Sequence, residues 1–356
     1  MIPHAIPSLN GCEAWHVVSA LNANEPASGA FIPKFEDSIR ALTGATHAIA
    51  VSSGTAALHL ALVLAGIQRG DKVVVPATTF VATANAVRAA GAEPVILAVE
   101  PETWGLDPNK LDDYLKTHTV AGILPVHLYG HPCHLDAISG MAARYGAVVV
   151  EDAAECLGAT YKGLPVGHPG TACNRPMLAC LSFNGNKLVT TGGGGMVLTD
   201  DDRLAEQARH LIGQAKLGDD LYGDGFNYRM PNLNAAVGYG QMQTIQDRLA
   251  SKRATHGHYA RHLPMFTELP WARSSYWLPA VKAGDAEGAR AKLAEAGIEA
   301  RRVWRPLTDH PHLKNCETFH VEFAETLYRE WLTLPSTCGI SEEERMRVVE
   351  AVLPCR

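Results

Sequence analysis

Long apolar runs and clustered positive charge are both missing from this sequence. No apolar stretch reaches the roughly 20 residues that a membrane-spanning helix needs, so no membrane partner is expected. The N-terminus has no basic region followed by an apolar core, which excludes a typical secretory signal. The net charge of −6 and the lack of a basic cluster argue against nucleic acid as a partner.

Closely spaced cysteines are also missing. The eight cysteines are scattered, and no two of them form a CxxC pair, so neither a zinc site nor a disulfide framework is expected and no metal is assigned. This pattern fits a reducing cytoplasm, which is the expected location. What the chain does have is 356 residues with 47% hydrophobic and 19% charged composition, typical of a globular protein with a large core.

Apolar segments alternate with helical patterns through the first 200 residues. Strands are expected at 48–52, 72–75, 94–99, 121–126, 147–150, 177–183 and 196–199, with helices at 35–42, 55–65, 80–90, 109–115 and 135–145. These strands are apolar throughout rather than alternating, which indicates a parallel sheet covered on both faces. The sequence therefore predicts an α/β fold with three layers.

The last third of the chain has a different pattern. A helix is expected at 202–216, a long helix at 234–262, strands at 276–281 and 299–304, a helix at 285–295 and two closing helices. We interpret this as a large domain over residues 1–250 and a small α+β domain over residues 251–356.

The stretch from Ser182 to Met196, SFNGNKLVTTGGGGM, is the most informative part of the sequence. Lys187 lies between an apolar strand and an unbroken run of four glycines, where the backbone can turn sharply or approach a ligand closely. Taken alone, the stretch also fits a β-hairpin whose turn carries an ordinary exposed lysine. The other strand ends decide between these interpretations, because ligands of open α/β sheets bind at the carboxyl ends of the strands.

Two of these strand ends are followed by the start of a helix. After the first strand, Gly54 and Thr55 place backbone N–H groups and a hydroxyl at a helix N-terminus, which suits a phosphate, although an ordinary Ser/Thr cap fits as well. After the second strand, Phe80 lies at a helix start and could stack on a planar ring or belong to the core.

The strand at 147–150 leads into EDAAE. Asp152 and Glu155 have the spacing of a helix capping box, which is the structural alternative for this pair. A carboxylate that leaves an apolar sheet at the same edge as Lys187 nevertheless needs a cationic partner, and a protonated pyridine nitrogen would be one. Together, these residues predict a pyridoxal phosphate site in which Lys187 forms the Schiff base, Asp152 holds the ring nitrogen, and Ser182 helps to hold the phosphate.

The chain resembles the DegT/DnrJ/EryC1/StrS family of fold-type I pyridoxal phosphate enzymes. The segments that carry the resemblance are SSGTAALHLAL, PATTFVATANAV, VHLYGHPCHLDAI, VVVEDAAECLGATYKG, SFNGNK, TTGGGGM and NYRMPNLNAAVGYGQM. The resemblance implies the same roles for Lys187 and Asp152, stacking of Phe80 on the cofactor ring, and Glu155 near its phenolic oxygen. It also places Gly54, Thr55 and Ser182 at phosphate-contacting positions.

The same resemblance implies a homodimer with shared active sites. Asn227 matches an asparagine that reaches the phosphate in the neighbouring subunit. SFNGNK and EDAAE are most similar to the perosamine synthase and legionaminic-type branch, which implies a GDP- or UDP-linked 4-keto-6-deoxy sugar as acceptor. L-Glutamate is our hypothesis for the amino donor. Arg229 is the candidate for the donor carboxylate, with a structural or interface ion pair as its alternative.

Parts of the sequence depart from the family pattern. The N-terminal loop segment, NEPASGAFIPKFE, is altered, and WRPLTDHPHL has Thr308 where the family often has histidine, with His310 two residues later. These changes would be expected of a non-catalytic cofactor-binding sensor or regulatory homologue, which is one alternative. A second is an aminotransferase that acts on a 3-keto sugar or a non-nucleotide cyclic ketone. Lys187 favours transamination over the family's dehydratases, which carry histidine at that position.

Overall fold

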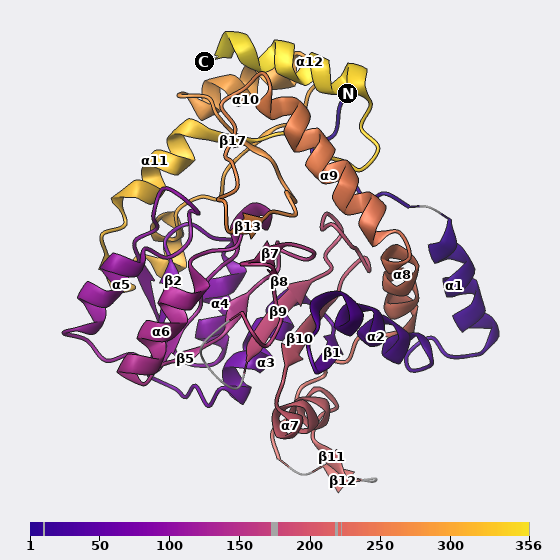
Figure 1. Cartoon of the computed structure of the whole chain (residues 1–356). Coiled ribbons are helices and arrows are strands. Elements are labelled where there is room, and N and C mark those ends of the chain that lie inside the picture. The colour runs from indigo at the N-terminus through magenta and orange to yellow at the C-terminus, as the bar shows by residue number, and fades with distance from the viewer. Residues whose placement is uncertain (10, 172–176, 218–219, 222, 356) are drawn as a thin grey trace.

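The computed structural model describes residues 1–9, 11–171, 177–217, 220–221 and 223–355, and a central sheet dominates the larger part of the molecule (Figure 1). The strand order is β16-β3-β2-β4-β5 in one part of the sheet and β6-β9-β10-β1 in the other. A bridge between Val126 and Asp152 joins the two parts where β5 continues into β6. The strands are β1 His47–Val51, β2 Lys72–Pro76, β3 Glu93–Leu97, β4 Gly122–Ile123, β5 Val148–Val149, β6 Glu151–Asp152, β9 Leu178–Ser182, β10 Gly195–Thr199 and β16 Thr318–Phe319.

The predicted mostly parallel sheet is confirmed. Only the ladders of β10 with β9 and with β1 are antiparallel within this sheet, as far as the described residues show. The carboxyl ends of β1, β2, β4, β6 and β9 therefore meet at one edge of the sheet, where the ligand sites of such folds lie.

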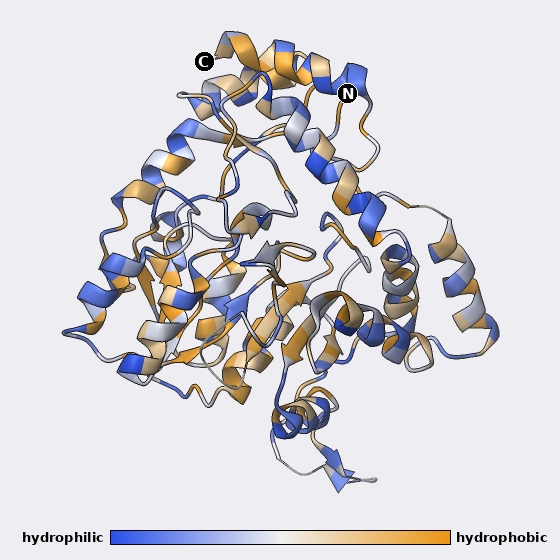
Figure 2. Cartoon of the chain, viewed as in Figure 1, coloured by the Kyte–Doolittle hydropathy of each residue, from blue (hydrophilic) through white to orange (hydrophobic). Residues whose placement is uncertain are grey.

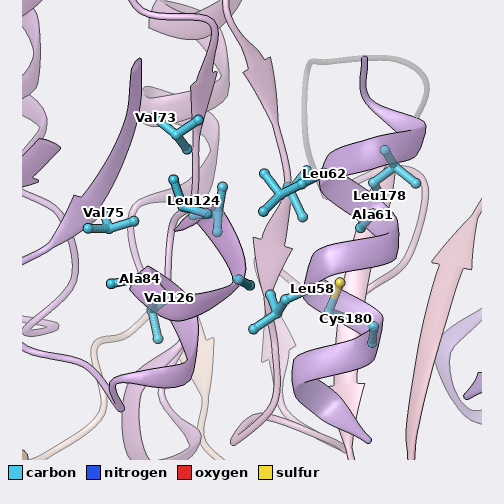
Figure 3. Close-up of a cluster of buried hydrophobic side chains, with 14 of the residues drawn as sticks. Leu58, Ala61, Leu62, Val73, Val75, Ala84, Leu124, Val126, Leu178 and Cys180 are labelled. Carbon is cyan, nitrogen blue, oxygen red and sulfur yellow. The ribbon is translucent and has the colours of Figure 1, made fainter. Parts of the chain in front are cut away.

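Helices cover both faces of this sheet. Val73 and Val75 of β2 pack into one apolar cluster, and Val74 between them packs into another on the opposite face. Figure 3 shows the first cluster, in which Leu58 and Leu62 of α3 face the strands. Both faces of the strand are thus buried, as the unbroken apolar sequence predicts.

The helices of this part are α1 Cys12–Asn22, α2 Phe31–Thr43, α3 Gly54–Leu64, α4 Ala82–Ala89, α5 Pro108–Leu115, α6 Leu135–Tyr145, α7 Asp202–Ile212 and α8 Asn232–Met242. Figure 2 shows blue turns on α5 and on α9 (Ile245–Ala260) and mostly orange central strands, so hydrophilic residues gather on the outer helices. Among the described residues, no helix is both long and apolar enough to cross a membrane.

Two helix predictions were wrong in length. The helix expected at 234–262 is two helices, α8 and α9 Ile245–Ala260, because Thr244 leaves the helical conformation (φ −119°, ψ 22°). The Thr244 hydroxyl instead accepts a hydrogen bond from Nε of Arg248 (3.1 Å) in the first turn of α9. The helix expected at 202–216 ends at Ile212, since the chain turns there to pair with residues 226–228.

The C-terminal part builds a smaller antiparallel sheet in the order β14-β17-β15. Its elements are β14 Ala280–Lys282, α10 Ala286–Glu295, β15 Arg301–Arg302, α11 Glu322–Glu330, β17 Trp331–Thr333 and α12 Glu342–Val352. The short strands outside the two sheets are β7 Thr160–Tyr161, β8 Leu164–Pro165, β11 Lys216–Leu217, β12 Asp220–Leu221 and β13 Ala272–Arg273. The strands expected at 276–281 and 299–304 are thus shorter than predicted. The domain boundary near residue 250 stays a prediction. Leu249 packs in an apolar cluster of the large part, and Tyr259 packs in that of the small part. Ile2, near the N-terminus, also packs in the cluster of the small part.

Candidate active site

A cavity of about 270 Å³ lies at the edge where the carboxyl ends of the parallel strands meet. Several residues predicted for the site line it, together with neighbours of these residues in the same sequence segments and with residues that the sequence did not single out. They are Gly54, Thr55, Phe80, Asp152, Glu155, Ser182 and Lys187 from the prediction, and Ser53, Leu58, Thr79, Ala82, Thr83, Val126, Ala154, Asn184, Asn186, Gly193, Gly194, Trp277 and Trp304 besides.

Lys187 lies on the connection between the antiparallel strands β9 and β10. A hairpin-like connection is therefore present, but the lysine on it is not an exposed surface charge: its side chain is 12% exposed. Nζ lies 3.5 Å from Oε1 of Glu155 and 3.6 Å from the centre of the Trp277 ring. Burial lowers the pKa of Lys187, and the carboxylates of Glu155 and Asp152 oppose that shift.

The connection that carries Lys187 is tethered at both ends. Nε1 of Trp277 donates to the carbonyl of Asn186 (2.7 Å), next to the lysine. Nδ2 of Asn234 donates to the carbonyls of Thr191 (2.7 Å) and Gly193 (3.2 Å), which fixes the glycine run. These bonds hold the backbone on either side of Lys187 and so restrict where its amine can lie.

Asp152 ends β6 and leads into a turn rather than a helix, so the capping-box alternative does not apply. Its carboxylate is buried and accepts hydrogen bonds from the Thr83 hydroxyl (2.7 Å) and from the N–H of Ala154 (3.2 Å). Burial raises the pKa of Asp152, opposed by the Thr83 bond and by Lys187. Within the described residues Asp152 forms no ion pair. A cation bound in the cavity would therefore supply the positively charged partner that a buried carboxylate needs.

Glu155 is the second buried carboxylate of the cavity. Its Oε2 accepts the N–H of Tyr129 (2.8 Å), and its Oε1 accepts Nε1–H of Trp304 (3.1 Å) beside Nζ of Lys187. Burial raises the pKa of Glu155, and the charge of Lys187 opposes the shift. The carboxylate is thereby fixed by two neutral donors and directed at the amine.

The start of α3 also lines the cavity. The Ser53 side chain caps this helix by accepting the N–H of Ala56 (3.0 Å), and the N–H groups of Gly54 and Thr55 belong to the first turn, which has no helical acceptors. A Cβ on Gly54 would lie 2.7 Å from Cβ of Ser182, so only glycine allows this close approach. The Ser53 cap is therefore present, and it is compatible with the predicted phosphate site, because the cap uses the N–H of Ala56 and not those of Gly54 and Thr55.

Four predicted residues do not line this cavity. Asn227 and Arg229 are exposed, and the Arg229 guanidinium lies against Gly213 in its own chain. Thr308 and His310 are half-buried in and after a short turn at 307–309. Their roles stay predictions.

Two tryptophans of the cavity were missed by the sequence analysis. Trp277 and Trp304 come from the last quarter of the chain, and no local pattern marks them as site residues. The Phe80 ring packs against Trp304, with centroids 5.0 Å apart at 56°, and half of its surface remains exposed. An aromatic wall thus stands beside the buried carboxylates.

The donor set fits pyridoxal phosphate. The start of α3 suits the phosphate, Asp152 suits a protonated ring nitrogen, and Lys187 is a buried amine with a lowered pKa. Elsewhere, Glu100, Glu102 and His134 form a cluster whose possible metal-binding atoms lie within 4.8 Å of one another. None of these three residues lines the cavity.

Comparison with known proteins shows the family of the chain. The model of the DegT/DnrJ/EryC1/StrS aminotransferase family matches residues 8–353. The chain is 37% identical to the GDP-perosamine synthase of Caulobacter vibrioides (98% of this chain, 96% of the relative) and 34% identical to that of Escherichia coli O157:H7 (99% and 97%). The crystal structure of S. venezuelae DesV superposes with a TM-score of 0.90 at 28% identity, covering 98% of both chains. The chain therefore belongs to the DegT/DnrJ/EryC1/StrS family, and it is a pyridoxal phosphate-dependent aminotransferase.

Proposed function

We propose that this enzyme transfers the amino group of L-glutamate to a GDP- or UDP-linked 4-keto-6-deoxy sugar, for a surface polysaccharide or glycan. The observation that carries the proposal is the buried amine of Lys187, held 3.5 Å from Glu155 in a cavity that also contains Asp152. The similarity to two GDP-perosamine synthases over nearly the whole chain supports a nucleotide-linked sugar as acceptor.

The chemistry divides between cofactor and chain. Pyridoxal phosphate, when bound, supplies a carbon that accepts the amino group and a ring that takes up an electron pair. Nζ of Lys187 takes a proton from the α-carbon of glutamate in the first half-reaction and delivers a proton to C4 of the sugar in the second. Its lowered pKa increases the fraction of free amine near neutral pH, which a proton acceptor requires.

The two carboxylates orient these events. Asp152, which the Thr83 hydroxyl orients, would hold the protonated ring nitrogen of the bound cofactor as its ionic partner. Glu155 stabilises the ammonium of Lys187 each time the lysine holds a proton. In the proposed homodimer, the exposed Asn227 and Arg229 serve the neighbouring subunit's site, the latter by binding the glutamate carboxylate.

The experiment is a two-step amino transfer assay on purified protein. Loaded enzyme is first treated with glutamate, and formation of 2-oxoglutarate is measured; GDP- and UDP-linked 4-keto-6-deoxy sugars are then offered separately. Formation of an amino sugar from either panel member supports the proposal. Release of 2-oxoglutarate without reaction of any 4-keto sugar would contradict the proposed acceptor. Transfer to a 3-keto sugar would show that a 3-keto sugar is the acceptor instead.

A further inference from the structure

Lys252, in the middle of α9, is a buried cation whose hydrogen-bond acceptors carry no charge. The residue is 4% exposed, and its Nζ donates to the carbonyl of Trp277 (2.9 Å) and to the hydroxyl of Ser336 (2.9 Å). No carboxylate in the described part of the chain forms an ion pair with it, and burial lowers its pKa to about 8. An unpaired buried ammonium costs free energy, so its presence calls for a role other than stabilisation.

α9 holds one short turn, residues 274–277, through several side chains. Besides the Lys252 contact, Nε of Arg253 donates to the carbonyl of Ser274 (3.0 Å). The His256 ring stacks on Tyr276, with centroids 3.6 Å apart at 12°. Tyr276 has φ +47°, a conformation that bulky residues rarely adopt and that persists only when its surroundings impose it.

This strained turn places the Trp277 ring over the reacting amine. The ring centre lies 3.6 Å from Nζ of Lys187, and Nε1 donates to the carbonyl of Asn186. The backbone carbonyl of Trp277 is therefore held by Lys252 and by the Ser336 hydroxyl that Lys252 also binds, and its indole is held by the Lys187 loop. Trp277 is 1% exposed, so the ring leaves little room for water on that side of the amine.

We propose that Lys252 is a positioning residue for amino transfer, which holds Trp277 over Nζ of Lys187 and keeps water from that amine. This inference rests on the proposed role of Lys187 as the reacting amine. If the ring is released, water reaches Nζ and solvates its ammonium form, so the pKa of Lys187 rises. Less free amine is then available near neutral pH, and the proton transfers slow down.

The test uses Lys252→Met, which keeps an unbranched side chain one atom shorter than lysine, with Lys282→Met as the matched control because the Lys282 side chain is 54% exposed. The first readout is the pH midpoint for acetylation of Lys187 by acetic anhydride in the cofactor-free full chain, measured by peptide mass spectrometry. We expect this midpoint to move to higher pH in Lys252→Met only. In the loaded enzyme we expect kcat to fall about tenfold with little change in KM for glutamate.

A folded Lys252→Met protein with an unchanged acetylation midpoint would overturn the inference. If that variant does not fold, Ser336→Ala is the second test. It removes one acceptor of the Lys252 amine and also the bond that the Ser336 hydroxyl donates to the Trp277 carbonyl (3.1 Å), so a shift in the same direction is expected. No shift would again overturn the inference. A double-mutant cycle with Trp277→Phe gives a further check, because additive losses in kcat would show that the two residues act separately. Failure of wild-type Lys187 to hold the cofactor would instead contradict the proposed function, while the acetylation comparison remains interpretable.

Discussion

Nζ of Lys187 and Oε1 of Glu155 lie 3.5 Å apart in the cavity. The carboxylate raises the pKa of Lys187 and the ammonium lowers the pKa of Glu155, so each group favours the charged form of the other. This pairing offsets part of the burial that favours the neutral amine. The balance between the two effects sets how much free amine is present at a given pH.

Glu155→Gln tests this balance. The substitution removes the negative charge that raises the pKa of Lys187, so burial lowers that pKa further. We expect the acid limb of the kcat profile for the glutamate half-reaction to move to lower pH. Stopped-flow rates between pH 5 and 9 would measure this, and a limb that moves to higher pH would contradict the assignment.

Thr83→Val tests the orientation of Asp152. The valine cannot donate the 2.7 Å hydrogen bond, so the pKa of Asp152 rises further and its hold on the ring nitrogen weakens. A hydrogen bond to a charged group contributes about 1.5–3 kcal/mol, so we expect a loss of at least about tenfold in kcat. Thr79→Val, which removes the bond between the Thr79 and Thr83 hydroxyls, is the control and should lose less. Equal losses in the two variants would show that Asp152 is not oriented by Thr83.

Gly54→Ala tests the phosphate end of the cavity. The new Cβ would lie 2.7 Å from Cβ of Ser182, which forces the start of α3 away from β9. We expect weaker binding of pyridoxal phosphate and a loss of about 1–3 kcal/mol in the free energy of unfolding. Gly140→Ala in α6 is the matched control because its Cβ would meet nothing within 4 Å. Cofactor titration and urea unfolding measure both effects, and unchanged cofactor affinity in Gly54→Ala would contradict the site.

The lowered pKa of Lys252 predicts a pH dependence of stability. Between the folded pKa of about 8 and the ordinary value of 10.5, the unfolded chain binds more protons than the folded one, so this group makes the free energy of unfolding rise with pH. Relative to Lys252→Met, the wild type should gain about 2 kcal/mol between pH 7.5 and 9.5. Urea unfolding at the two pH values measures the difference, and a parallel change in both proteins would exclude a buried ammonium.

The sequence predicts those parts of the site that follow directly from a strand. Asp152 and Ser182 lie at strand ends, Gly54 begins a helix after a strand, and Lys187 follows β9, so a local pattern suffices to bring them to one edge. Trp277 and Trp304 cannot be found in this way. They contact residues 91 and 149 positions away in the sequence, and only the packing of the C-terminal part on the sheet brings them there.

The break between α8 and α9 shows the same limit. Residues 234–262 carry a helical pattern, but tertiary contacts decide that Thr244 leaves the helix and that α9 reaches the turn at Trp277. Arg229 is predicted to bind the donor carboxylate because a guanidinium can form two hydrogen bonds with a carboxylate. In the structure its backbone bridges Val51 and its guanidinium lies against Gly213, and no local pattern reveals these long-range contacts.

The central claim is that Lys187 holds pyridoxal phosphate and exchanges it with an amino donor. The most direct measurement is the absorbance spectrum of the loaded protein before and after glutamate, beside Lys187→Ala. We predict that the yellow band of the wild type gives way to the shorter-wavelength band of the aminated cofactor, and that Lys187→Ala does not turn over. A spectrum that glutamate leaves unchanged would contradict the proposed donor, and a Lys187→Ala protein with near-normal turnover would contradict the account of the site.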